Sequence, residues 1–284
     1  MGLDILGKRE DGFHEIRTIF QTIALHDRLT ISRIRQNQIQ FRSNCREINP
    51  EDNLVVEAIN LLRKHTRVSG GFALHVEKKI PLGAGLGGGS SNAAAAILGV
   101  GRLLDLVFSN ECLFEWGGSL GSDVPFFFVG GRGLGLGRGS EVYPLEDTVR
   151  KHLLVVVPSF PVSTVDAYAR LSLPLTKKFN VSMIPAFCSG YLDGLTRKKW
   201  LENDFETVVF EQFPDLKKLR QDLLNLGASG AGLTGSGSAL FGVFGSKKSL
   251  TRACSALESK SIQLIQTQTL SRAQYQKGII ESLQ

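Results

Sequence analysis

The pattern of hydrophobic and polar residues in the N-terminal part of the chain predicts several short strands. β-branched residues are dense over residues 16–34, and apolar and polar residues alternate over residues 71–77, as in a strand with one buried face. The segments cover residues 16–34, with one or two strands of a meander around a turn at Leu25-His26-Asp27, and residues 38–42 and 71–77. We predict that all of them are strands.

Other segments of this part show helical spacing. Apolar residues recur at intervals of three and four over residues 53–65, and Asn53 is well placed to cap that helix. An alanine-rich stretch over residues 92–106 predicts a helix, and a second, shorter helix is predicted near residues 111–117.

Residues 124–129 and 130–139 carry no such period. The first run is almost wholly apolar, which fits a buried strand. The second, GGRGLGLGRG, has the glycine content of a phosphate-binding loop, but no helix follows it. A tight hairpin is therefore the better interpretation.

Strands and helices alternate in the rest of the chain. Predicted strands at residues 153–157, 239–244 and 262–267 are separated by helices at 163–171 and 250–259, a mostly helical region up to 226 and a glycine turn at 227–237. This order predicts an α+β fold. A polar stretch precedes the strand at 153, so we expect one domain over residues 1–148 and a second over 149–284.

Composition narrows the class of protein. With 42% hydrophobic and 21% charged residues, the 284-residue chain has the balance of a globular protein rather than of a disordered one. It contains no apolar run long enough to span a bilayer and no signal-peptide pattern at its start. We therefore expect a cytoplasmic protein without a membrane partner.

The cysteines and the charges limit the possible ligands. Four cysteines lie far apart, without a C-x-x-C pair, so neither a disulfide framework nor a zinc site is predicted. A net charge of +6 suits an anionic partner. Because the basic residues form scattered pairs rather than one block, we do not expect that partner to be nucleic acid.

The glycine-rich segment over residues 81–91, PLGAGLGGGSS, carries the clearest chemistry. Glycines allow positive φ and close approach to a ligand, and the helix that follows offers unpaired N–H groups and a positive dipole end. Ser90 and Ser91 add hydroxyls that reach phosphate or magnesium. A turn that only packs a helix on a sheet would need fewer glycines, and the lysine of a Walker A loop is absent. We predict an anion site of another kind.

This loop resembles the phosphate-binding motif of the GHMP kinases, the family of galactokinase and of homoserine, mevalonate and phosphomevalonate kinases. Three more segments agree in the same order: REDGFH at residues 9–14, GSDVPF at 121–126 and LTGSGSA at 233–239. The match extends over essentially the whole chain. It implies a two-domain GHMP kinase fold, with an N-terminal domain like domain 2 of ribosomal protein S5 and a C-terminal ferredoxin-like α/β sandwich.

The resemblance also implies an ATP site and a catalytic residue. Asp123 matches the aspartate that orients the acceptor hydroxyl and takes its proton, although alone it would be interpreted as a turn or cap residue. Asn53 matches a position of the nucleotide site, although its cap role explains it locally. Magnesium is implied as a cofactor, with no residue assigned as its ligand. The residues expected to hold the ATP phosphates are Pro81, Leu82, Gly83, Ala84, Gly85, Leu86, Gly87, Gly88, Gly89, Ser90 and Ser91.

Within the family, GLGGGSSNAA and DGFH particularly resemble members whose acceptor is a cytidine diphosphate ester of methylerythritol. By similarity, His14 hydrogen-bonds the cytosine edge, and Phe13 replaces the usual tyrosine, which keeps the aromatic face and drops a hydroxyl. Tyr168 resembles the second aromatic residue near the base, with a packed helix residue as the alternative. Gly235 and Ser236 lie in the third motif, beside the phosphate loop, and are also assigned to the substrate site; a plain glycine turn is their alternative.

Family members begin with a strand that carries a Lys-(Ile/Val)-Asn-Leu motif, whose lysine neighbours the catalytic aspartate. The present sequence starts just after that motif, and residues 2–6 resemble the remainder of the strand. Such a lysine would stabilise the charge of the reacting oxygens. We therefore expect the natural start to lie further upstream.

The resulting hypothesis is an ATP- and magnesium-dependent kinase, monomeric or weakly dimeric, that phosphorylates the 2-hydroxyl of this ester in isoprenoid biosynthesis. One alternative is a GHMP kinase of the homoserine or mevalonate type, which the segment at residues 11–14 disfavours. A second is a nucleotide-binding protein with impaired catalysis, because the lysine motif is absent. A third, a basic nucleic-acid-binding module, predicts steeply salt-dependent binding.

Overall fold

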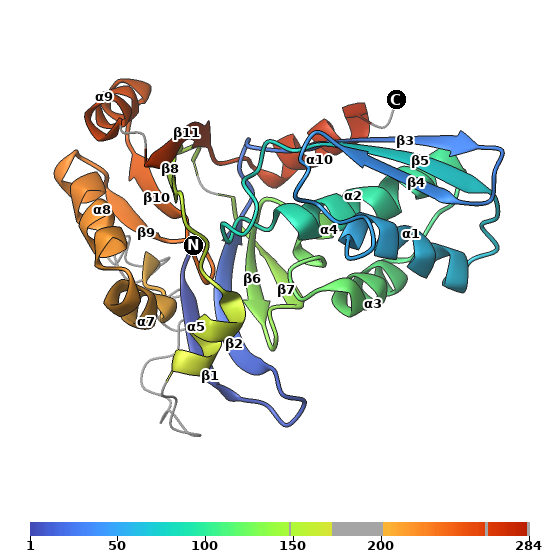
Figure 1. Ribbon diagram of the computed structural model, residues 1–284, viewed down its shortest axis with the longest axis horizontal. Helices are drawn as coiled ribbons and strands as arrows, with labels where there is room; N and C mark the ends of the chain where they lie inside the picture. Colours follow the sequence, from blue (N-terminus) through green and yellow to red (C-terminus); the bar gives the residue numbers. More distant parts are fainter. Residues whose placement is uncertain (148, 172–200, 259–260, 283–284) are drawn as a thin grey trace.

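Three sheets organise the chain in the computed structural model, which describes all residues except 148, 172–200, 259–260 and 283–284 (Figure 1). Helices cover two of these sheets, and the third lies between them. Strands and helices are thus mixed along the chain, as the α+β prediction requires.

The central sheet carries the start of the chain. It is antiparallel, with the order β1-β2-β6-β7. Glycine is required at Gly135 in this sheet, because a Cβ there would lie 2.4 Å from the ring of Phe20. The hairpin predicted at residues 130–139 is confirmed as β6 and β7. The strands are β1 (Leu3–Lys8), β2 (His14–Gln21), β6 (Arg132–Leu136) and β7 (Glu141–Leu145).

The second sheet has the order β3-β5-β4 and is covered on one face by helices (Figure 1). Phe72, Leu74 and Val76 of β5 are buried in one cluster with residues of the helices, whereas His75 on the opposite face is exposed. This period of two confirms the predicted strand. The elements are β3 (Arg28–Ile34), β4 (Ile39–Ser43), β5 (Gly71–Glu77), α1 (Leu54–His65), α2 (Gly88–Leu103) and α3 (Asn110–Leu120).

The third sheet is formed by the C-terminal part of the chain in the order β11-β8-β10-β9. All its strand pairs are antiparallel. Its elements are β8 (His152–Pro158), β9 (Gly230–Leu233), β10 (Leu240–Phe244) and β11 (Ile262–Gln268), with α5 (Thr164–Arg170), α7 (Phe205–Gln212), α8 (Pro214–Asn225) and α9 (Lys247–Leu257).

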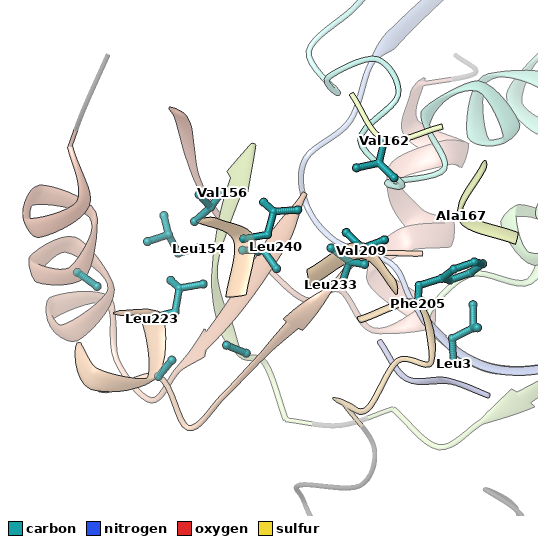
Figure 2. Packing of buried hydrophobic residues seen from close by; sticks show 14 of the residues in the cluster. Leu3, Leu154, Val156, Val162, Ala167, Phe205, Val209, Leu223, Leu233 and Leu240 are labelled. Atoms are coloured by element: carbon teal, nitrogen blue, oxygen red, sulfur yellow. The ribbon is translucent and has the colours of Figure 1, made fainter. Parts of the chain in front are cut away.

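Strand β8 is buried on both faces. Leu154 and Val156 point into the cluster that includes Leu223 and Leu240 (Figure 2). Val155, on the opposite face, packs in a different cluster that includes Ala84 of the phosphate loop. The apolar run of β8 thus joins the C-terminal helices to the phosphate loop.

The first two strands also belong to the C-terminal core. Leu3, Ile5 and Ile16 are buried in the same cluster as Leu154 and Phe205, and Figure 2 shows Leu3 close to Phe205. The backbone of Leu3 donates a hydrogen bond to the carbonyl of Glu202 at 2.9 Å. The two parts of the chain therefore share buried surface through β1 and β2.

The final helix, α10 (Arg272–Ser282), returns to the N-terminal part of the chain. Its Tyr275 hydroxyl donates to the carbonyl of Phe127 at 2.8 Å, and its Arg272 guanidinium donates to the carbonyl of Arg132 at 2.7 Å. No sequence pattern predicted this helix, whose residues do not form an apolar stripe.

Several predicted elements are wrong. Residues 124–129 do not form a strand; Phe126–Val129 is a short helix, α4, which follows Pro125 and ends at Gly130 with φ 66°. An apolar run without a period does not distinguish a buried strand from a buried helix. Strands β2 and β3 belong to different sheets rather than to one meander.

Two glycine-rich segments also differ from the predictions. Helix α2 begins at Gly88 rather than at Asn92, so the last glycines of the phosphate loop are helical. The predicted turn at residues 227–237 contains strand β9. Glycine suits this strand because a Cβ at Gly230 would lie 2.2 Å from Leu201. Residues 172–200 of the predicted helical region lie outside the described residues.

Candidate active site

A cleft of 2030 Å³ lies where the three sheets meet. A pocket for one small ligand typically has about 300–1,000 Å³, so this cleft has room for two. The predicted site residues that line it are Phe13, His14, Gly85, Leu86, Gly87, Ser90, Ser91, Asp123, Tyr168, Gly235 and Ser236. Those outside its lining are Asn53, Pro81, Leu82, Gly83, Ala84, Gly88 and Gly89.

The phosphate loop presents the amino end of α2 to this cleft. Gly87, the residue that precedes the helix, has φ 68° and therefore favours glycine. The first helical hydrogen bond runs from the N–H of Ser91 to the carbonyl of Gly87 at 2.9 Å. The N–H groups before Ser91 therefore lie in the first turn, where helices leave donors for an anion. No acidic side chain occupies that turn of α2.

The third motif supports the loop from the C-terminal part of the chain. The Thr234 hydroxyl donates to the carbonyl of Ala84 at 2.7 Å. A Cβ at Gly85 would lie 2.2 Å from the carbonyl oxygen of Thr234, so only glycine allows this approach. The predicted contact between these two motifs is thus present in the structure.

A buried asparagine that the sequence patterns did not reveal holds the third motif. Asn203 donates from Nδ2 to the carbonyls of Gly235 at 2.7 Å and Leu233 at 3.1 Å. Its Oδ1 accepts from the N–H of Phe205 at 3.0 Å. Ser236, next to Gly235, shares a hydrogen bond of 2.7 Å with the Thr164 hydroxyl. The only available signal was the position of Asn203 just before a helix.

Asp123 lies in the turn before α4, and its carboxyl group is accessible from the cleft. The protein that surrounds it disfavours the charged form and raises the pKa of the carboxyl above its ordinary value. The amino group of Met1 acts in the opposite direction. The Asp123 carboxyl group therefore lies in a partly desolvated part of the cleft, where the uncharged form is favoured more than in water.

A stacked aromatic pair also lines the cleft. The rings of His14 and Tyr168 stack with centroids 4.3 Å apart and planes 16° apart. Burial and the charge of Lys8 lower the pKa of His14, whereas burial and the charge of Asp123 raise the pKa of Tyr168 to about 12. Both rings are thus neutral near pH 7.

Phe13 is half exposed and lies against a cation. Its ring is 50% exposed, and the guanidinium carbon of Arg138 lies 4.6 Å from its centroid. Arg138 also lines the cleft. This arginine, in the glycine-rich hairpin, was not among the predicted site residues.

Two family models match the chain. The model of the GHMP kinases N terminal domain matches residues 53–131, and the model of the GHMP kinases C terminal domain matches residues 183–263. Together they cover more than half of the sequence.

Curated relatives match nearly the whole chain. The 4-diphosphocytidyl-2-C-methyl-D-erythritol kinase of Solibacter usitatus is 44% identical over 263 residues, which cover 90% of this chain and 82% of the relative. The enzyme of the same name from Caldicellulosiruptor bescii is 37% identical over 273 residues, covering 95% and 94% of the two chains.

Solved structures share the fold. A crystal structure of 4-(cytidine 5'-diphospho)-2C-methyl-D-erythritol kinase superposes with a TM-score of 0.79 at 30% identity and covers 94% of this chain and 95% of its own. The homoserine kinase of Cytophaga hutchinsonii has a TM-score of 0.67 at 18% identity, with 89% of each chain covered, and shows the fold alone. The predicted two-domain GHMP kinase fold is confirmed.

Proposed function

The chain belongs to the GHMP kinase family, and on this basis we propose that it transfers the γ-phosphoryl group of ATP to the 2-hydroxyl of 4-diphosphocytidyl-2-C-methyl-D-erythritol. The products would be ADP and the 2-phosphate, in isoprenoid biosynthesis. One observation carries the proposal: a single cleft holds the anion-binding end of α2, the Asp123 carboxylate and the His14–Tyr168 pair. The names of the curated relatives support the same substrate.

ATP is the donor that the family implies, and the phosphate loop suits its phosphates. The first-turn N–H groups of α2 would bind phosphate oxygens, and Gly85 and Gly87 give the loop two positive-φ positions that favour glycine. Positioning and charge stabilisation dominate phosphoryl transfer, because the transferring group needs little covalent help from the protein. The loop would supply both.

Magnesium would neutralise charge on the phosphates, and the oxygen ligands it prefers are present at the cleft. Ser90, Ser91 and Asp123 supply hydroxyl and carboxylate oxygens. The described residues contain no group of three His, Cys, Asp or Glu side chains that could hold a metal ion. Phosphate oxygens and water would therefore complete the coordination, as is usual for this ion.

Asp123 would orient the acceptor hydroxyl and take its proton. A carboxylate whose pKa is raised is a better proton acceptor than an ordinary one, as long as it remains ionised at the working pH. The neutral imidazole of His14 has one donor and one acceptor nitrogen, which suits the mixed donor and acceptor edge of cytosine. Phe13 and Tyr168 would supply aromatic surface to the base.

The remaining predictions are part of the same proposal. We place the nucleotide-binding domain at residues 1–148 and the C-terminal domain at 149–284, and we expect a monomer or weak homodimer in the cytoplasm, without a nucleic-acid partner. Among the described helices, none is both long and apolar enough to cross a membrane.

The test is the identity of the phosphorylated acceptor. The purified chain would be incubated with ATP and magnesium and with the cytidine diphosphate ester, homoserine or mevalonate in separate reactions, and the products identified by phosphorus NMR. We expect a new monophosphate ester on the 2-oxygen of the cytidine compound only. Turnover of homoserine or mevalonate alone would refute the proposed acceptor, and ATP binding without any turnover would refute catalysis.

A further inference from the structure

One buried carboxylate contacts both ends of the phosphate loop. The Oδ1 atom of Asp27 accepts from the N–H groups of Lys79 at 2.7 Å and Ile80 at 2.8 Å, just before the loop. Its Oδ2 atom accepts from Nδ2 of Asn92 at 2.8 Å, just after it. The Lys78 ammonium completes the set at 2.5 Å from Oδ2.

This cluster is shielded from water. The Asp27 side chain is fully buried, that of Lys78 is 8% exposed, and Asn92 is also 8% exposed. Burial alone would raise the pKa of Asp27, but the hydrogen bonds from Ile80, Lys78, Lys79 and Asn92 together hold it below its ordinary value. Asp27 is therefore ionised at neutral pH and has a donor at each of these four contacts.

The segment between the contacts is rich in glycine. Residues 81–91 include five glycines, and glycine loses more backbone freedom on ordering than any other residue. The loop carries the N–H groups that would face the phosphates, and such groups act only when they are held in position. Thr234 holds the middle of the loop through Ala84, and Asp27 holds its two ends.

Lys78 links the cluster to the start of the helix. A Cβ at Gly88 would lie 3.0 Å from the Lys78 Nζ atom, so the ammonium lies directly on the first residue of α2. Asp27 holds this ammonium by an ion pair. The position of the helix end relative to β5 thus depends on the Asp27 carboxylate.

We propose that Asp27 is a positioning residue for ATP: its carboxylate fixes the two ends of the phosphate loop and thereby the N–H groups that bind the phosphates. The inference rests on the proposed ATP site but not on the identity of the acceptor. Asp27 needs no contact with the nucleotide to act in this way.

The test is Asp27→Asn. Its amide oxygen can still accept from Lys79 and Ile80, but its NH₂ group would face the donors of Lys78 and Asn92. We expect the affinity for a nonhydrolysable ATP analogue, measured by calorimetry without acceptor, to fall about tenfold or more, while KM for the acceptor changes by less than about twofold. A loss confined to melting temperature, with unchanged analogue affinity, would overturn the proposal.

Asp147→Asn is the matched control. Asp147 accepts from the backbone N–H of Arg272 at 2.7 Å, and it lies outside the cleft lining, so this variant makes the same carboxylate-to-amide change at a backbone contact elsewhere. Its analogue affinity should equal that of the original chain, and an equal loss in both variants would contradict a specific role of Asp27.

If Asp27→Asn does not fold, Asp27→Glu tests the same claim. It keeps the charge but moves the carboxylate by one methylene, so we expect intermediate analogue affinity, and original affinity would overturn the proposal. Because binding is measured without acceptor, a wrong acceptor assignment would leave these results unchanged.

Discussion

Asp123 can accept a proton only while it is ionised, and the surrounding protein opposes that ionisation. Its raised pKa predicts that activity falls as the pH decreases through a value above the ordinary aspartate range of about 3.9. The profile of kcat/KM against pH measures this value. An acidic limb at or below pH 4 would show that nearby positive charge outweighs the effect of desolvation on Asp123.

Replacing Asp123 tests its proposed role as the general base. For Asp123→Asn we expect kcat to fall by about 10²–10⁴-fold, the usual contribution of a general base, with a nearly unchanged KM for ATP. The control is Ser119→Ala, which removes a hydroxyl that donates to the carbonyl of Trp116 at 2.8 Å outside the cleft lining and should retain activity. Equal activity of the Asp123 variant would exclude it as the catalytic base.

Two substitutions of Tyr168 distinguish the role of its aromatic ring from that of its hydroxyl group. Its ring stacks on His14, so Tyr168→Phe should keep KM for the cytidine substrate. Tyr168→Ala should raise that KM by about tenfold, since base–aromatic stacking is worth about 1–3 kcal/mol. Steady-state kinetics with varied substrate checks both variants, and an equal effect of the two would favour a role for the hydroxyl.

Site residues differed in how far sequence could reveal them. The phosphate loop and the Asp123 segment are runs of neighbouring residues, so their composition is visible in one window. Asp27 and Asn203 act through partners far along the chain: 51 residues separate Asp27 from Lys78, and 32 separate Asn203 from Gly235. No local pattern encodes such contacts, so both residues were missed.

At the scale of the element, Asn53 caps helix α1 and is also predicted to contact the nucleotide. Its Oδ1 accepts from the N–H of Val55 at 2.8 Å, and the amide NH₂ is the group that remains for ATP. Asn53→Asp keeps the cap and loses that donor, so we expect unchanged stability and a raised KM for ATP. Asn53→Ala should also lose about 1 kcal/mol of unfolding free energy.

Chemical denaturation and ATP kinetics measure the two effects separately. Ser109→Ala serves as the control, because Ser109 caps α3 by accepting from Cys112 at 3.3 Å and is not a predicted residue of the nucleotide site. It should lose stability without a change in KM for ATP. An original KM in Asn53→Asp would show that Asn53 is a cap alone.

Elements with a clear period or a cap were predictable, whereas the apolar run at residues 124–129 and the glycine-rich strand β9 were not. Asn53 and the spacing after it predicted α1 almost to the residue. Residues 124–129 have no polar face, and a window with one kind of residue carries no period that separates strand from helix. Strand β9 lacks β-branched residues, because Leu201 approaches Gly230 too closely for a side chain there.

At the scale of the whole molecule, assembly of the sheets is a non-local outcome. The sequence predicted strands at β2 and β3 but not that they enter different sheets, nor that β1 and β2 join the C-terminal core. The sheet that a strand joins, and the core in which it packs, depend on apolar surfaces that lie far away along the chain. A local window of the sequence does not contain that information. The hydrophobic and polar pattern predicted only the α+β class. The two-domain GHMP kinase fold was predicted from the family resemblance.

Shared packing predicts that the two halves unfold together. Leu3 and Ile5 are buried with Phe205, α10 binds Phe127 through Tyr275, and Thr234 donates to Ala84. We therefore expect one calorimetric transition rather than two. An ATP analogue at about 100 times its Kd should stabilise the whole protein by about 2.7 kcal/mol and shift that transition upwards by about 5 °C or more.

Thr234→Val tests whether the phosphate loop takes part in this coupling. It removes the hydroxyl that reaches Ala84 while it keeps a similar shape, so the analogue should raise the melting temperature less than in the original chain. The control is Thr207→Val, whose hydroxyl donates to Asp204 on the surface and lies outside the cleft lining. Its shift with the analogue should match that of the original chain. Two separate transitions in the original chain, only one of them moved by the analogue, would show that the halves are independent despite their shared core.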